Sequence, residues 1–240
     1  MKNILIVYAH EEPRSFNAAL KDTAVRVLTQ AGHSVTVSDL YAMKFDPTGG
    51  SHDFTERANP DFFKYGQEQI VASERGTFVE QVAAEQRKLL ACDLLIFQFP
   101  LWWFGLPAIL KGWVDRVFAA GLTYGAGRFY SRGVMRGRRA MACLTTGGPE
   151  TMYGPRGING DMEQILFPIN HGIFYFVGFD VLPPFIAYAP AHVSPEQRAA
   201  CLAQYADRLL NWQTAPVIPY RPLEDYDEHF VLKAGLSPAP

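Results

Sequence analysis

The chain has 240 residues, a net charge of −2 and an apolar content of 48%. This length suits one α/β domain with a small extension, and the apolar fraction supplies a sizeable core. The basic residues form no block beyond Arg136, Arg138 and Arg139, so the sequence lacks the electrostatic footprint of a nucleic-acid-binding protein. We therefore expect no nucleic-acid partner.

The three cysteines, Cys92, Cys143 and Cys201, lie far apart and contain no CxxC pair. Scattered cysteines in odd number give no disulfide framework, which favours the reducing cytoplasm. The strand pattern that begins at Asn3 leaves no room for a signal peptide. The most apolar stretch, 165–179, is interrupted and shorter than the about 20 residues of a membrane span. We expect a cytoplasmic protein with no membrane span.

Strand and helix patterns alternate along the chain. Short apolar runs predict strands, and apolar residues at helical spacing predict helices between them. The predicted strands are 4–8, 35–38, 94–99, 139–144 and 181–188. The predicted helices are 15–30, 78–90, 108–118, one that begins near Asp161, and one from Ser194 to about Trp212. This alternation predicts a flavodoxin-like, doubly wound α/β fold with a five-stranded parallel sheet in the order 2-1-3-4-5.

Two long stretches, 41–76 and 119–137, show no regular pattern and are predicted to be irregular. Loops of this length in a compact domain are usually functional or cover a partner. After Trp212 the chain holds five prolines and little periodicity. We therefore predict a main domain, 1–214, and an extended surface tail, 215–240.

The most informative segment joins a predicted strand to a predicted helix. Trp102, Trp103 and Phe104 form a tight turn between the strand 94–99 and the helix that begins at Ala108. Ligands bind at the carboxyl ends of strands in open parallel sheets, and aromatic planes there suit a flat conjugated ligand such as a flavin ring. Aromatics that only fill the core explain this segment equally well.

Two other strand ends carry candidate binding groups. Arg14 and Ser15 stand at a helix start, where free backbone N–H groups favour a phosphate, although a plain helix cap also explains Ser15. After the fourth strand, the residues 145–148 expose backbone donors. Downstream, Tyr153 and Asn159 can donate hydrogen bonds to a charged ring, although simple packing explains their spacing as well.

Nucleophilic and metal chemistry are not indicated. The chain holds no GxSxG and no HExxH, and its six histidines show no metal-ligand spacing.

Taken together, these segments resemble the NAD(P)H:quinone oxidoreductases of the DT-diaphorase type over residues 2–212. Six motifs carry the likeness in the same order: YAHxxPRSFN at 8–17, SDLYAM at 38–43, FQFPLxWFGxPAILKGW at 97–113, TTGGxxxMY at 145–153, GDM at 160–162 and VGF at 177–179.

The resemblance implies that 1–214 is an FAD-binding catalytic domain, and that a homodimer holds one FAD in each of two interface sites. The residues expected toward the adenosine diphosphate are His10, Ser15, Phe16, Asn17 and Arg198, with Lys64 reaching the FAD of the partner subunit. Those expected to hold the flavin are Leu101, Trp102, Trp103, Phe104, Thr145, Thr146, Gly147, Gly148 and Tyr153. The pocket in which nicotinamide and quinone bind in turn would be walled by Trp103, Phe104 and Met152, together with Tyr124, Phe129 and Phe176 of the partner subunit.

The resemblance also implies a reaction. A hydride would pass from NAD(P)H or a related reduced nicotinamide to FAD, and then to a quinone, in a two-electron ping-pong cycle. Tyr153 and Asn159 would stabilise the charge that develops on the flavin. Two alternatives stay open: a flavin-binding regulatory subunit of a transporter, and an azo- or nitro-reductase on the same fold.

The chain departs from the family pattern in three places. Asn159 stands where the mammalian NAD(P)H-using enzyme has histidine, and it matches the relative that prefers dihydronicotinamide riboside. That relative binds a metal through three side chains. Here only His171 is kept, and Tyr175 and Tyr220 occupy the other positions, so we predict no metal. The C-terminal extension is short and different, which leaves the electron donor open.

Overall fold

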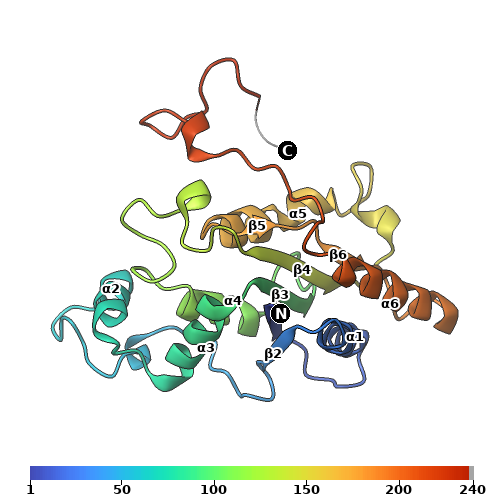
Figure 1. Ribbon diagram of the computed structural model, residues 1–240, viewed down its shortest axis with the longest axis horizontal. Helices are drawn as coiled ribbons and strands as arrows, with labels where there is room; N and C mark the ends of the chain where they lie inside the picture. Colours follow the sequence, from blue (N-terminus) through green and yellow to red (C-terminus); the bar gives the residue numbers. More distant parts are fainter. Residues whose placement is uncertain (238–240) are drawn as a thin grey trace.

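The computed structural model describes residues 1–237, in which six strands form one parallel sheet (Figure 1). The order is β2-β1-β3-β4-β5, and β6 also pairs with β4. The strands are β1 (Asn3–Tyr8), β2 (Ser34–Asp39), β3 (Leu94–Pro100), β4 (Arg139–Thr145), β5 (Asp180–Val181) and β6 (Phe185–Ala187). The predicted flavodoxin-like fold and strand order are confirmed.

Helices cover both faces of this sheet. On one face, α1 (Phe16–Gln30) and α6 (Pro195–Leu210) lie side by side (Figure 1). On the other face lie α3 (Glu80–Ala91), α4 (Ala108–Val117) and α5 (Met162–Ile169). The helix α2 (Tyr65–Arg75) lies outside these layers and packs in a small separate cluster with Phe54 and Phe78.

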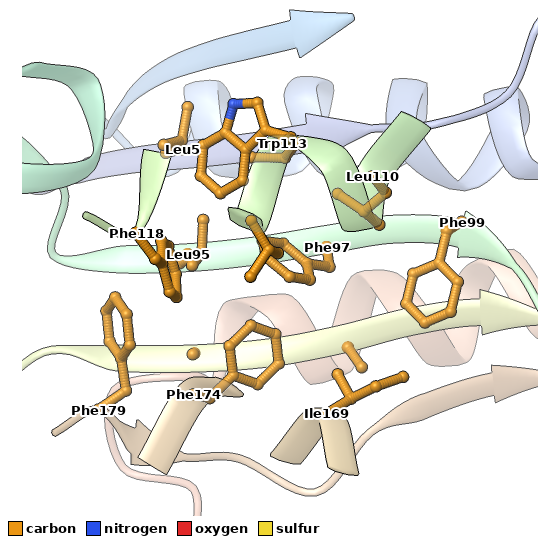
Figure 2. Close-up of a cluster of buried hydrophobic side chains, with 14 of the residues drawn as sticks. Leu5, Leu95, Phe97, Phe99, Leu110, Trp113, Phe118, Ile169, Phe174 and Phe179 are labelled. Carbon is orange, nitrogen blue, oxygen red and sulfur yellow. The ribbon is translucent and has the colours of Figure 1, made fainter. Parts of the chain in front are cut away.

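Side chains along each central strand alternate between the two helical layers. On β3, Leu95, Phe97 and Phe99 pack toward α4 and α5, whereas Leu94 and Ile96 pack toward α1 and α6. Figure 2 shows the first group, in which the ring of Phe97 lies 5.7 Å from Trp113 and 4.7 Å from Phe174. Burying one such side chain contributes about 1.5–3 kcal/mol, so both faces hold the strand in place.

The structure differs from the sequence prediction at the fifth strand. A single strand over 181–188 is wrong, because β5 ends at Val181 and β6 begins only at Phe185. Pro183 and Pro184 lie between them. Proline has no backbone N–H to give to the ladder, so the strand is divided where the two prolines fall.

The first long stretch is also more regular than predicted, because 41–76 contains α2. The buried face of this helix consists of Glu68, Gln69 and Ala72. Glu68 accepts hydrogen bonds from the backbone of Ala58 and Asn59, and polar groups therefore take the place of an apolar stripe. A helix that buries polar side chains gives no hydrophobic period to detect.

The tail after α6 contains one 3₁₀ turn, Leu223–Asp225, within the described residues. The Ile218 N–H donates to the Val181 carbonyl at 2.8 Å, and the Tyr175 hydroxyl donates to the Arg221 carbonyl at 2.8 Å. The tail then projects from the body (Figure 1). The last three residues of the predicted tail, 238–240, lie outside the described residues, and the division at 214 stays a prediction. No helix within 1–237 is long and apolar enough to cross a membrane.

Candidate functional site

Four loops meet at the carboxyl edge of the sheet, after β1, β3, β4 and β6. The register pairs Tyr8 with Gln98, Pro100 with Thr145, and Thr145 with Ala187, so these strands end close to one another. Because all strands are parallel, their following loops lie on the same side. Most of the predicted cofactor-binding residues belong to these loops and therefore meet at one edge.

The loop after β3 is a two-residue turn of unusual composition. Trp102 and Gly105 exchange backbone hydrogen bonds of 3.2 and 3.0 Å, and the residues between them are Trp103 and Phe104. Both have positive φ, at 50° and 59°, which hairpin turns normally assign to Asn or Gly. Each such residue costs about 1–2 kcal/mol.

The same two aromatic residues are also exposed. Trp103 is 97% exposed and Phe104 is 51% exposed. Side chains so open to solvent contribute little to the core, so the core-filling explanation does not hold for them. Backbone strain that is retained together with exposed aromatic rings is typical of a binding site.

The loop after β1 leads into the N-terminus of α1. Ser15 caps this helix, because its Oγ accepts a hydrogen bond from the Ala18 N–H at 3.1 Å. The cap leaves the N–H groups of Phe16 and Asn17 without intrahelical acceptors. The His10 Nδ1 accepts from the Glu12 N–H at 3.1 Å, so the neutral ring carries its hydrogen on Nε2, where it is free to donate.

A charged pair also lies in this loop. Arg14 donates to the Glu12 carboxylate at 3.1 Å, and this hydrogen bond lowers the pKa of Glu12. Both side chains are well exposed, so the pair contributes little to stability.

The loop after β4 offers an open stretch of backbone. A Cβ placed on Gly147 would meet no atom within 4 Å, so a ligand can approach the chain there. The Thr146 hydroxyl donates to the Gly148 carbonyl at 2.8 Å and fixes the turn. Further along, a Cβ on Gly157 would lie 2.4 Å from the Met152 backbone, so only glycine fits. The Asn159 N–H donates to the Met152 carbonyl at 2.9 Å and folds the loop back on itself.

Tyr153 lies in this folded loop and packs on Tyr188, which follows β6. Their ring centroids are 5.9 Å apart. Burial, and then the nearby Glu150 carboxylate, raises the pKa of Tyr188. Tyr188 could not be identified from the sequence, because its position beside Tyr153 depends on the pairing of β6 with β4.

Arg198 and Lys64 lie in different surroundings. Arg198 donates to the carbonyls of Val193 at 2.7 Å and Pro190 at 3.3 Å, and so ties the loop after β6 to the first turn of α6. Lys64 precedes α2, and its ammonium lies 5.7 Å from the centre of the Phe62 ring. Among the described residues no hydrogen bond joins Lys64 to the carboxyl-edge loops, and its role toward a partner's cofactor stays a prediction.

The predicted substrate-pocket residues fall into two separate groups. Trp103, Phe104 and Met152 lie in carboxyl-edge loops. The second group consists of Tyr124, Phe129 and Phe176, whose rings lie 5.4 Å (Tyr124 to Phe176) and 6.2 Å (Phe129 to Phe176) apart.

The path of α4 sets this separation. This helix starts at the carboxyl edge and runs back for 10 residues, about 15 Å. The loop 119–137 therefore begins near the opposite edge, from which β4 starts. Phe176 is held there as well, since its carbonyl accepts from the Tyr130 N–H at 2.8 Å. Within one chain, the two groups thus lie at opposite edges of the sheet.

Two cavities adjoin the second group. One, of about 490 Å³, is lined by Tyr124, Phe118 and Phe176 among others. The other, of about 410 Å³, lies between Phe129, Phe176 and residues of the tail such as Tyr226.

His171, Tyr175 and Tyr220, for which the resemblance raised the question of a metal site, form an aromatic cluster. The ring of His171 stacks on Phe167 at 4.6 Å and lies 5.0 Å from Tyr220 and 5.6 Å from Tyr175. Burial lowers the pKa of His171. Within residues 1–237 no cluster of three or more His, Cys, Asp or Glu side chains is suited to a metal ion. The absence of a metal stays a prediction.

An open parallel sheet of this order, with helices on both faces, defines a flavodoxin-like α/β protein. The flavodoxin-like fold family matches residues 2–212, and the chain belongs to this family. It is similar to the ribosyldihydronicotinamide dehydrogenase [quinone] of Homo sapiens, with 44% identity over 218 residues that cover 90% of this chain and 94% of the relative.

Two further comparisons agree with this assignment. The NAD(P)H dehydrogenase [quinone] 1 of Cavia porcellus is 43% identical over 232 residues, which cover 96% of this chain and 84% of the relative. A crystal structure from Klebsiella pneumoniae, described as a candidate quinone reductase, superposes with a TM-score of 0.96 at 42% identity. The superposition covers 99% of this chain and 96% of that one.

Proposed function

We propose that the protein is an FAD-dependent oxidoreductase that reduces quinones with a reduced nicotinamide as electron donor. When bound, FAD supplies the chemistry, because it accepts a hydride from the nicotinamide and passes it to the quinone. The observation that carries this proposal is the meeting of the exposed Trp103–Phe104 turn, the open backbone at Gly147 and the Tyr153 loop at one edge of the sheet. The likeness to quinone dehydrogenases supports it.

The donor set fits FAD. Unpaired N–H groups at the start of α1 suit the pyrophosphate, and the His10 Nε2 adds a donor beside them. Arg198, at the first turn of α6, suits the adenine side. The flat ring system matches the segment 101–104 on one side and the segment 145–148, with Tyr153, on the other.

The residues of this chain orient the reactants and stabilise charge. In the proposed site, Tyr153 donates a hydrogen bond from its phenol and Asn159 from its amide. Asn159 has no titratable proton near neutral pH, so it donates without becoming a cation. Trp103 and Phe104 exclude water from the ring face, which strengthens these hydrogen bonds. One pocket then accepts the nicotinamide and the quinone in turn.

A purified sample tests the cofactor. We expect a visible absorption spectrum of an oxidised flavin, and FAD in the material released by denaturation and identified by mass. Steady oxidation of NADH by a simple quinone, with no other protein present, distinguishes an enzyme from a regulatory subunit. Higher kcat/KM for an azo dye or a nitroaromatic than for quinones would favour the alternative reductase. Only FMN, or no flavin after reconstitution, would contradict the proposal.

The two groups of pocket residues also support a twofold homodimer. Trp103, Phe104 and Met152 stand at one edge of the chain, and Tyr124, Phe129 and Phe176 stand near the other. A second copy related by a twofold axis brings the first group of one subunit to the second group of its partner. Both sites are then shared, and each subunit alone has an incomplete pocket.

Mixed dimers test this sharing. Phe104→Ala and Tyr124→Ala each damage every site of their own homodimer, so both homodimers should be poorly active. A dimer of one subunit of each kind has one site with both changes and one intact site. We therefore expect it to recover about half of the native turnover.

The matched control pairs Phe104→Ala with Trp103→Ala. These two changes lie in the same group, so no intact site forms and no activity should return. Recovery in this control pair, or full turnover by a monomer in light scattering, would contradict a shared pocket.

We also place the protein in the cytoplasm. Cys92 and Cys143 are buried free thiols, and Cys201 is free and half-buried. Burial raises the pKa of Cys92 to about 12, so its thiol stays protonated and unreactive. Free thiols of this kind suit a reducing compartment.

A further inference from the structure

A buried chain of three polar side chains lies just inside the carboxyl edge. Gln98 of β3 donates from Nε2 to the Asn17 Oδ1 at 2.8 Å. Asn17 of α1 donates in turn from Nδ2 to the Thr145 Oγ1 of β4 at 2.7 Å. Gln98, Asn17 and Thr145 are 0%, 3% and 7% exposed, so all three are buried and Thr145 is the most exposed of them.

Strand alternation puts this chain of hydrogen-bonded side chains on the α1 face of the sheet. Gln98 pairs in register with Cys143, and Thr145 lies two residues further along β4, so both side chains point to the same side. Asn17, in the first turn of α1, bridges them. The chain therefore links three elements whose loops form the proposed flavin site.

The hydrogen bonds in this chain have a direction. Because the Asn17 Nδ2 donates to Thr145, the Thr145 oxygen acts as acceptor and its own hydrogen is left over. Within residues 1–237 no protein group accepts that hydrogen. The hydroxyl hydrogen of Thr145 is thus available to a ligand that binds at the carboxyl edge of the sheet.

Gln98 sets this direction. Its Oε1 is buried and has no hydrogen-bond partner among the described residues. Turning both amides around would put two unpaired N–H groups of Gln98 in that place, and buried unpaired N–H groups are rarer than unpaired carbonyl oxygens. The unpaired Gln98 Oε1 therefore favours the orientation in which Gln98 donates to Asn17.

We propose that Gln98 is a positioning residue, which fixes the direction of the Gln98–Asn17–Thr145 chain so that the Thr145 hydroxyl donates its hydrogen to an acceptor atom of the bound flavin. This inference rests on the proposed function and adds a residue that contacts no cofactor. A single hydrogen bond of this kind changes a dissociation constant by up to about tenfold. It becomes stronger when the acceptor carries negative charge, so it favours the reduced flavin.

The test uses Gln98→Glu and Gln98→Met. In Gln98→Glu, the introduced carboxylate only accepts, so Asn17 turns its N–H toward it and its Oδ1 toward Thr145, which consumes the hydroxyl hydrogen. When the introduced carboxyl group is neutral, it donates to Asn17 and restores the native direction. Burial raises the pKa of a carboxyl group, so the switch should fall within the range of about pH 6–9. We expect Gln98→Glu to bind FAD with native affinity at low pH and about tenfold more weakly at high pH.

The native protein and Gln98→Met provide the comparison. Tyr8 and Cys143 flank position 98 on the neighbouring strands, and Tyr205 lies beside Cys143. Burial raises the pKa of each, so none of them titrates in this range. Any pH dependence of FAD affinity that comes from the rest of the site is common to all three proteins, so the extra step of Gln98→Glu should be absent from the native protein and from Gln98→Met. Gln98→Met should bind FAD several-fold more weakly at every pH, because Asn17 is no longer oriented. The reduction potential of bound flavin should be more negative in both variants wherever FAD affinity falls.

Thr145→Val distinguishes an effect of hydrogen-bond direction from general damage to the FAD site. It keeps the shape of the side chain and removes the hydroxyl, so Gln98→Glu should cause no further loss of FAD affinity on this background. Thr145→Ser should restore the pH step. Native affinity without a pH step in both Gln98 variants, or equal losses with and without the Thr145 hydroxyl, would overturn this inference alone. A native protein that binds no flavin would overturn the proposed function with it.

Discussion

Replacing Tyr153 with phenylalanine is expected to slow the reduction of bound flavin by about 10²-fold, the usual effect of losing a donor that stabilises developing charge. The phenol is the only part of this side chain that the change removes. The ring can still pack on Tyr188, whose centroid is 5.9 Å away, so the loop should keep its fold. Stopped-flow absorbance with excess reduced nicotinamide measures the rate directly, before quinone is added.

Tyr188→Phe is the matched control for this experiment. It removes a phenol from the other member of the same ring pair, and no catalytic role is proposed for that phenol. We expect its rate of flavin reduction to stay within a few-fold of the native rate. Equal rates for native protein and Tyr153→Phe would show that Tyr153 only packs the loop. Equal losses in both variants would mean that the ring pair acts through the shape of the loop.

The core strands could be predicted from the sequence because short apolar runs between helical patterns indicate buried strands. β1, β3 and β4 each contain a short run of apolar residues, and each is buried on both faces. The loops that follow them could be placed at one edge for the same reason, since parallel strands end on the same side. Trp103 and Phe104 could be placed in this way, because they follow a predicted strand directly and therefore lie at the carboxyl edge.

Features that depend on contacts between distant elements could not be predicted. Gln98 reads as one polar residue within an apolar strand, and its hydrogen bond to Asn17 is seen only in the folded chain, where α1 packs on β3. The helix α2 was missed because its buried side chains, Glu68 and Gln69, are polar and accept hydrogen bonds from the loop backbone of Ala58 and of Ala120. The placement of Tyr124 at the opposite edge from Trp103 follows from the length of α4.

Replacing the turn residues Trp103 and Phe104 by Asn and Gly is expected to stabilise the flavin-free protein and to damage its function. The present pair has φ values of 50° and 59°, which Asn and Gly adopt with much less strain. Relief of about 1–2 kcal/mol per residue exceeds the roughly 0.5–1 kcal/mol of chain entropy that glycine costs. Trp103 is 97% exposed and Phe104 is 51% exposed, so the burial lost is about half of one aromatic ring and offsets part of this gain. We expect the free energy of unfolding to rise by about 1 kcal/mol, while quinone kcat/KM falls at least about tenfold with the loss of the aromatic faces.

Urea unfolding of the flavin-free protein and steady-state turnover measure the two effects separately, and Ala126→Gly is the control. Ala126 also has a positive φ, of 51°, but lies in the loop 119–137, and glycine there removes strain without removing an aromatic ring. It should therefore gain stability and keep native turnover. A loss of stability in the Asn-Gly variant would mean that the two aromatics pack the fold after all. A gain of stability with unchanged FAD affinity and turnover would place the substrate pocket away from this turn, because the strain would then serve no ligand.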